Sequence, residues 1–211
     1  VRINRRDGRY LELDDGSTFV PIGCNLCIPR LPAGTPPADV ETAGLATYER
    51  WLGNLSRHGG NMARLWLGCD FFDVEHAGAG TFDDRRFDHL RRVLDFARAG
   101  GVRLKLTLEH FRFLLPEAHR EHRLTVHPFA RLIYHQDHGG PLRSMQEYLE
   151  TPAGHDLFLR KLDRFAAALA DDPAVFGWEL WNEMNCINGT GWDRWTARML
   201  GELRSRFPRH L

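Results

Sequence analysis

Segments with the apolar pattern of a β-strand alternate four times with segments of helical periodicity, and this alternation restricts the fold more than any single motif. The expected strands are residues 19–24, 61–67, 102–108 and a stretch that begins at residue 174; the expected helices are residues 39–58, 82–99, 154–170 and 192–206. Glycine pairs or Pro-containing turns separate several of them. Repeated strand–helix units predict parallel strands with helices packed outside, in a barrel or in a doubly wound sheet.

Polar side chains within the strands favour the barrel. Lys105 and Thr107 alternate with leucines in the third strand, and the fourth strand carries Glu179. Central strands of a doubly wound sheet are apolar on both faces, whereas a barrel interior can hold polar side chains stacked in layers. We therefore predict an α/β chain with the (β/α)8 TIM-barrel fold, of which only about the first four strand–helix units lie in residues 1–211. Inside the barrel, we expect Lys105 or Arg64 to neutralise Glu179.

The N-terminal residues carry a separate signal. Asp-Gly pairs at residues 7–8 and 15–16 flank the alternating stretch 10–13. They predict a small β-hairpin at about residues 2–20, ahead of the first barrel strand. Residues 1–211 are thus interpreted as the N-terminal part of a single barrel domain.

Composition narrows the choice of partners and cofactors. Lys and Arg number 28 against 28 Asp and Glu, and the arginine pairs alternate with Asp on a helix face, so no nucleic-acid partner is expected. No apolar run reaches the roughly 18 residues of a membrane span. Cys24 and Cys27 form a single Cys-x-x-Cys without a second half, so we expect buried thiols, no metal and no cofactor. A chain that begins with Val is compatible with a trimmed leader; a secreted or periplasmic location is favoured, although the compartment stays open.

The fourth strand ends in a feature with chemical meaning. Asn182 and Glu183 stand where the strand opens into a loop, which is where a barrel places its active site. Strict alternation would put Glu179, Trp181 and Glu183 on one face and Trp178 on the other. Glu183 is therefore a candidate proton donor. The alternative is that the two glutamates form structural salt bridges.

Four stretches of the chain resemble the N-terminal half of a clan A glycoside hydrolase, a group of (β/α)8 barrels that includes the cellulase-like and mannanase-like enzymes of glycoside hydrolase family 5. The matching stretches are residues 19–25, 61–66, 109–110 and 178–183. The resemblance covers essentially the whole chain, and the Asn-Glu pair at the end of a strand is its most specific part.

The resemblance implies a role for several residues. Glu183 would be the general acid/base, Asn182 would contact the sugar 2-hydroxyl, and Arg64 would support the nucleophile electrostatically. His110 would contact the substrate. The implied reaction is hydrolysis of O-glycosidic bonds in a β-linked polysaccharide or oligosaccharide by a retaining, two-carboxylate mechanism.

The same residues fit this chemistry directly. Glycoside hydrolysis needs one protonated carboxyl group and one ionised carboxylate. Aromatic rings at strand ends can serve as platforms for sugar rings, and we expect this of Trp66 and Trp181. Trp192 is equally well interpreted as the core anchor of the last helix.

The second carboxylate has no match in the chain. The resemblance places the nucleophile on a seventh strand, and Asp70, Asp73 and Glu109 are better interpreted as caps, loop ligands or sugar contacts. We therefore expect the nucleophile beyond Leu211 and expect residues 1–211 alone to be inactive. Open sheet edges are expected to promote self-association.

Two other functions remain open. The segment after the third strand contains six histidines, which could serve a metal-dependent barrel hydrolase, although no His-Glu-x-x-His pair occurs: His110, His119, His122, His127, His135 and His138. A carbohydrate-binding pseudoenzyme would keep the tryptophan platforms and lack the nucleophile.

Overall fold

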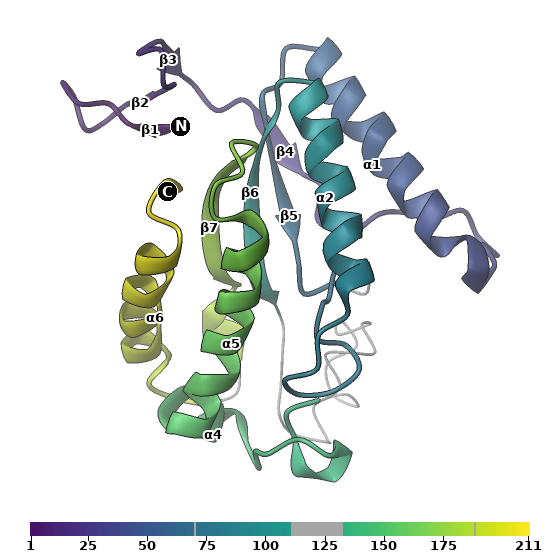
Figure 1. Ribbon diagram of the computed structural model, residues 1–211, viewed down its shortest axis with the longest axis vertical. Coiled ribbons are helices and arrows are strands. Elements are labelled where there is room, and N and C mark those ends of the chain that lie inside the picture. The colour runs from purple at the N-terminus through teal and green to yellow at the C-terminus, as the bar shows by residue number, and fades with distance from the viewer. Residues whose placement is uncertain (70, 111–132, 188) are drawn as a thin grey trace.

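A computed structural model describes residues 1–69, 71–110, 133–187 and 189–211 of the protein (Figure 1). Its main sheet has four parallel strands in the order β4-β5-β6-β7. These strands are β4 (Gly23–Asn25), β5 (Met62–Trp66), β6 (Arg103–His110) and β7 (Val175–Asn182). Sequential parallel neighbours are the arrangement that repeated strand–helix units predict, which confirms the α/β class.

Four long helices pack side by side around one face of this sheet (Figure 1). They are α1 (Val40–Arg57), α2 (Asp84–Ala99), α5 (Pro152–Leu169) and α6 (Trp192–Arg206), and all four lie within about two residues of their predicted bounds. Asp83 caps α2 by accepting from the backbone N–H of Arg85, and Gly101, with φ of 67°, provides the left-handed turn that follows this helix.

Shorter helices occupy the connections. A helix that was not predicted, α4 (Met145–Glu150), lies beyond the carboxyl ends of β6 and β7 (Figure 1). Single 3-10 turns are η1 (Pro37–Asp39), η3 (Gln136–His138) and η4 (Met184–Cys186). None of the described helices is long and apolar enough to cross a membrane.

The N-terminal hairpin lies within its predicted range but has three strands. Strands β1 (Arg2–Ile3), β2 (Leu11–Glu12) and β3 (Thr18–Phe19) form a three-stranded antiparallel sheet. It lies at the end of the molecule opposite α4 (Figure 1). The first barrel strand, predicted at residues 19–24, is present as β4, but its predicted start was wrong because Phe19 belongs to the small sheet. The amide of Asn61 bonds the backbone of Val20 and Ile22, and regular pairing with β5 begins only at Gly23.

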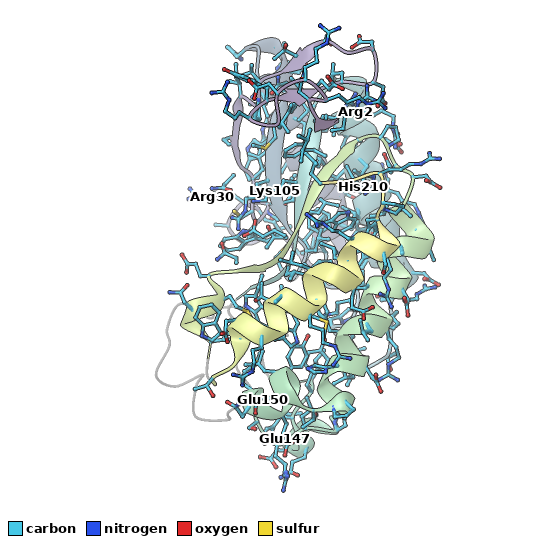
Figure 2. The ribbon with its side chains drawn as sticks, turned by 90° about the vertical axis from the view of Figure 1, so that its left-hand side faces the viewer. Arg2, Arg30, Lys105, Glu147, Glu150 and His210 are labelled. Carbon is cyan, nitrogen blue, oxygen red and sulfur yellow. The ribbon has the colours of Figure 1, made fainter. Side chains whose placement is uncertain are left out.

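Strand β6 shows the predicted alternation. Its leucines, Leu104, Leu106 and Leu108, are buried toward the helices. Lys105 projects from the opposite face, away from α5 (Figure 2). The sheet thus has one apolar face under the helices and one polar face that carries the candidate site.

Candidate active site

Five polar side chains from three adjacent strands form the candidate site on this polar face. In the strand register Arg64 of β5 pairs with Lys105 of β6, and Thr107 of β6 pairs with Glu179 of β7. Asn182, near the carboxyl end of β7, completes the set.

Arg64 and Glu179 form the centre of this cluster. Arg64 donates from Nε to Glu179 Oε2 at 2.8 Å and from Nη2 to Oε1 at 2.6 Å. Lys105 Nζ lies 2.9 Å from Glu179 Oε2, and Thr107 Oγ1 donates to the same oxygen at 3.1 Å. We predicted from the sequence that Lys105 or Arg64 neutralises Glu179. In the structure both cations contact this carboxylate, which confirms the prediction.

The contacts of Glu179 keep it ionised. Burial opposes its charge, but hydrogen bonds from Arg64 and Lys105 outweigh burial and hold the pKa of Glu179 below its usual value. The hydrogen bond to Glu179 likewise raises the pKa of Arg64. Two cations around one carboxylate leave this trio with one net positive charge.

Asn182 is tied to the same guanidinium. Its Oδ1 accepts from Arg64 Nη2 at 2.8 Å, and the residue is buried. Its amide nitrogen, also buried, has no hydrogen-bond partner among the described residues. A buried donor without a partner is costly, so this amide nitrogen calls for an explanation.

Glu183 follows β7 in an unusual backbone conformation. Its φ and ψ are both 53°, in the left-handed region, and it is the only non-glycine residue with positive φ in the described part of the chain. For an L-residue this conformation costs about 1–2 kcal/mol. The Glu183 side chain is exposed, and its charge acts on Arg64. Strain of this kind at a carboxylate is a reason to suspect function.

Trp66 is partly exposed beside Arg64, whereas Trp181 is buried. The Arg64 guanidinium lies 5.7 Å from the centre of the partly exposed Trp66 ring. Trp181 is only 5% exposed and packs edge-on against Tyr148 of α4 and Trp195 of α6. The prediction that Trp181 offers its face to a sugar is therefore wrong in this conformation, because α4 and α6 cover the ring.

Trp181 also shows that the predicted alternation fails at the end of β7. Glu179 and Asn182 both contact Arg64, although Asn182 is three positions after Glu179 in the strand. Strict alternation would place these two on opposite faces and would put Trp181 beside Glu179. The strand departs from alternation just before the left-handed Glu183.

Trp192 and Cys24 also differ from expectation. Trp192 is 39% exposed, and the buried anchor of α6 is Trp195. Cys24 is an exposed thiol, Cys27 is partly buried and Cys69 is fully buried, so the prediction of buried thiols holds only for Cys69 among these three.

The carboxylates near the strand ends fall into different places. Asp73 is buried and accepts from the backbone N–H of Glu75, in agreement with its interpretation as a loop residue. Glu109 is neither a cap nor a sugar contact in this structure, because it is buried against Lys161 of α5. Asp70 lies outside the described residues. His110 ends β6 opposite Asn182 in the strand register.

The histidines expected for a metal site are only partly described. Among the described residues, no group of three or more His, Cys, Asp or Glu side chains is arranged to hold a metal ion. His135 is used within its own loop, where Nε2 bonds the carbonyl of Arg143 and Nδ1 accepts from the backbone N–H of Asp137. His119, His122 and His127 lie outside the described residues.

The chain is similar in sequence and fold to known mannanases and mannosidases. No family model matches the chain. It is 28% identical over 162 residues to a mannan endo-1,4-β-mannosidase 2 of Oryza sativa subsp. japonica. The matched region covers 71% of this chain and 34% of the relative. The exo-β-1,4-mannosidase of Opitutaceae bacterium strain TAV5 superposes with a TM-score of 0.68 at 18% identity, over 96% of this chain and 33% of that one.

A second solved structure agrees. The endo-1,4-β-mannanase of Rhizomucor miehei also gives a TM-score of 0.68, at 16% identity, over 96% of this chain and 57% of that one. The fold is thus that of the TIM-barrel glycoside hydrolases, and the expected resemblance to the mannanase-like enzymes of family 5 is confirmed. The chain spans about a third of the length of the curated relative.

Proposed function

We propose that residues 1–211 form the first half of the barrel of a retaining glycoside hydrolase, in which Glu183 is the general acid/base. The observation that carries this proposal is the strained, left-handed Glu183 directly after an Asn182 that Arg64 holds. A carboxylate fixed at the carboxyl end of a barrel strand can reach a bound glycoside.

Each residue then has a distinct task. Glu183 protonates the glycosidic oxygen while a second carboxylate attacks the anomeric carbon, and it later removes a proton from the water that hydrolyses the glycosyl-enzyme. The unpartnered amide of Asn182 donates to the sugar 2-hydroxyl. His110 and the partly exposed Trp66 contact the sugar.

The nucleophile belongs to a later strand in this proposal. The net positive charge of Arg64, Lys105 and Glu179 favours the approach of another carboxylate to this face. The hydrogen bonds of Leu211 support a continuing sheet: its N–H donates to Phe176 O at 3.2 Å, and its carbonyl accepts from Trp178 N at 2.8 Å. That pattern is the one a parallel strand makes next to β7.

A β-1,4-linked mannan is the substrate we propose. The named relatives are mannanases or mannosidases. The full-length protein is expected to release reducing sugar from β-mannan faster than from cellulose. Binding of mannan without hydrolysis would instead favour the carbohydrate-binding pseudoenzyme.

The decisive experiment is Glu183→Gln in the full-length protein. Glutamine keeps the size and the hydrogen bonding but cannot deliver a proton, so hydrolysis of mannan should fall by about 10² to 10⁴. Aryl glycosides with activated leaving groups should be affected less at the first step. Glu49→Gln, an exposed change on α1, is the control. Full activity of Glu183→Gln on mannan would rule out the role.

A further inference from the structure

A buried ionic cluster lies between the sheet and α5, outside the residues assigned to catalysis. Lys161 Nζ lies 2.5 Å from Glu109 Oε1 and 3.0 Å from Glu75 Oε2. The side chain of Lys161 is 2% exposed, and those of both glutamates are fully buried. Tyr134 donates its hydroxyl proton to Glu75 Oε2, and the lysine ammonium lies 5.6 Å from the centre of the Tyr134 ring.

The cluster joins four separate segments of the chain. Glu109 is in β6, Glu75 is in the connection between β5 and α2, Tyr134 precedes η3, and Lys161 is in α5. Glu75 is itself fixed, because its Oε1 accepts from the backbone N–H of Gly80 at 2.6 Å. One ammonium group therefore connects a helix of the outer layer to the sheet and to a strand-end connection.

The position of Glu109 links this cluster to the candidate site. Glu109 is paired with Trp181 in the register of β6 and β7, and the next pair is His110 with Asn182. The side chain of Glu109 thus lies one residue from the strand ends that carry the proposed substrate contacts. A contact that holds Glu109 therefore acts within one residue of these strand ends.

Burial makes the ion pairs of Lys161 necessary for its charge. Lys161 shares the helix face of Phe158, Leu162 and Phe165, all of which are fully buried. A charged group among such neighbours is stable only when it is paired, and Lys161 supplies a positive charge to both carboxylates. Loss of the ammonium would therefore disturb both glutamates, and Glu75 would keep its bonds from Tyr134 and from the backbone N–H of Gly80.

We propose that Lys161 is a positioning residue: through Glu109 and Glu75 it fixes the carboxyl ends of β6 and β7 that present His110 and Asn182. The structural part of this proposal stands on the buried contacts alone. Its catalytic consequence rests on the proposed glycosidase function.

Hydrogen exchange tests the structural part in the full-length protein. Lys161→Met keeps the volume and the apolar stem but removes the ammonium, so the backbone amides of residues 107–110 and 179–182 should exchange about tenfold faster or more, while those of α1 should not change. Arg164→Met is the matched control, because Arg164 lies in the same helix and pairs with Asp84 at the surface. Equal exchange of these strand-end amides in Lys161→Met and wild type would overturn the proposal.

Kinetics test the catalytic part at a temperature at which each variant is fully folded. Lys161→Met should lower kcat on β-mannan by about tenfold or more and change KM less, because a small misplacement of reacting groups mainly costs turnover. Arg164→Met should leave both constants unchanged. Normal kcat in Lys161→Met overturns the positioning role. If wild type itself hydrolyses no glycan, the proposed function fails, and the exchange result still decides whether Lys161 holds the strand ends.

A second variant keeps the test decisive if Lys161→Met does not fold. Lys161→Met combined with Glu109→Gln removes one buried carboxylate along with the ammonium, and Glu75 keeps its bonds from Tyr134 and Gly80. This double variant should fold, yet show fast strand-end exchange and low kcat, because the ion pair between α5 and β6 is still missing. Wild-type exchange and turnover in the double variant would overturn the proposal.

Discussion

Arg64 on β5 donates two hydrogen bonds, of 2.8 and 2.6 Å, to Glu179 on β7, although β6 lies between these two strands. Strands that are two apart lie about 9–10 Å from each other in a flat sheet. The two side chains reach each other over Thr107 of β6, which donates to the same carboxylate. This contact favours a concave polar face, as a barrel wall requires.

Arg64→Lys should therefore not be a conservative change. A lysine has one compact ammonium, which cannot hold both oxygens of Glu179 and the amide oxygen of Asn182 at once. We expect turnover per folded molecule to fall by about tenfold or more, since Asn182 loses its support. The surface change Arg98→Lys is the comparison, because Arg98 pairs with exposed Asp95. Similar turnover in both variants would remove Arg64 from the site.

Asn182→Ala separates binding from folding. Loss of a contact that strengthens in the transition state should lower kcat more than it raises KM. The melting temperature should also fall, because Arg64 Nη2 loses one of its acceptors. If kinetics and melting curves show that only stability changes in both Asn182→Ala and Arg64→Lys, the assignment of this site is wrong.

The low pKa of Glu179 predicts a pH dependence of stability. Its folded-state pKa lies below the ordinary value of 4.5, so its ion pairs stabilise the fold above about pH 4.5, and this contribution is lost as the pH falls through the folded-state pKa. Glu179→Gln removes this contribution at every pH. The melting temperatures of wild type and variant should therefore differ most near pH 7, and the difference should shrink as the pH falls below 4.5. A constant difference across this range would contradict the prediction.

The polar face could be predicted from sequence because its signal is local. Lys105 and Thr107 stand in strict alternation with buried leucines, and parallel neighbouring strands must bring such residues to the same face as Glu179. The pairing of Arg64 with Glu179 followed from this face and from the cost of burying an isolated charge. Both inferences needed only the strand order.

The rest depended on contacts that no local pattern reveals. Trp181 is buried because Tyr148 belongs to α4, a helix in a segment interpreted as loop. Glu109 meets Lys161, which is 52 residues away in the chain. One signal was present: Lys161 occurs in helical phase with the core residues Phe158 and Leu162, and a lysine at such a position requires a buried partner.

His210 should give a second pH dependence of stability. Here the titrating group is a base, an imidazole, and not an acid such as Glu179. Trp178 Nε1 donates to His210 Nδ1 at 3.0 Å, so this nitrogen must be unprotonated, and the other ring nitrogen bonds the carbonyl of Asp172. Burial lowers the pKa of His210 below 6.5, against the favourable effect of the Asp172 carbonyl. The stabilising contribution is therefore complete above about pH 6.5 and is lost as the pH falls toward the folded-state pKa.

Denaturant unfolding of His210→Gln at pH 7.5 and pH 5.5 tests this effect. The variant should be less stable than wild type at pH 7.5, and the difference should shrink at pH 5.5, because wild type alone loses the Trp178 contact. His58→Gln, at the end of α1, is the control and should follow the wild-type pH profile. Parallel profiles for His210→Gln and wild type would show that His210 does not titrate as inferred.

The last prediction concerns association through β4, an edge strand of the described sheet. Val20 and Ile22, just before this strand, are 58% and 57% exposed, and an apolar, unpaired edge promotes pairing with another chain. Residues 1–211, purified alone, should sediment as a dimer or larger species and hydrolyse no glycan.

Ile22→Lys should weaken the dimer by about tenfold, or 1.4 kcal/mol, because an edge lysine opposes strand pairing. Leu200→Lys, at a position that is 46% exposed on α6, should leave the dimer unchanged. A monomer at all concentrations, or equal weakening of the dimer by both changes, would show that this edge is not the contact. Glycosidase activity of the isolated segment would contradict the inference of a nucleophile on a later strand.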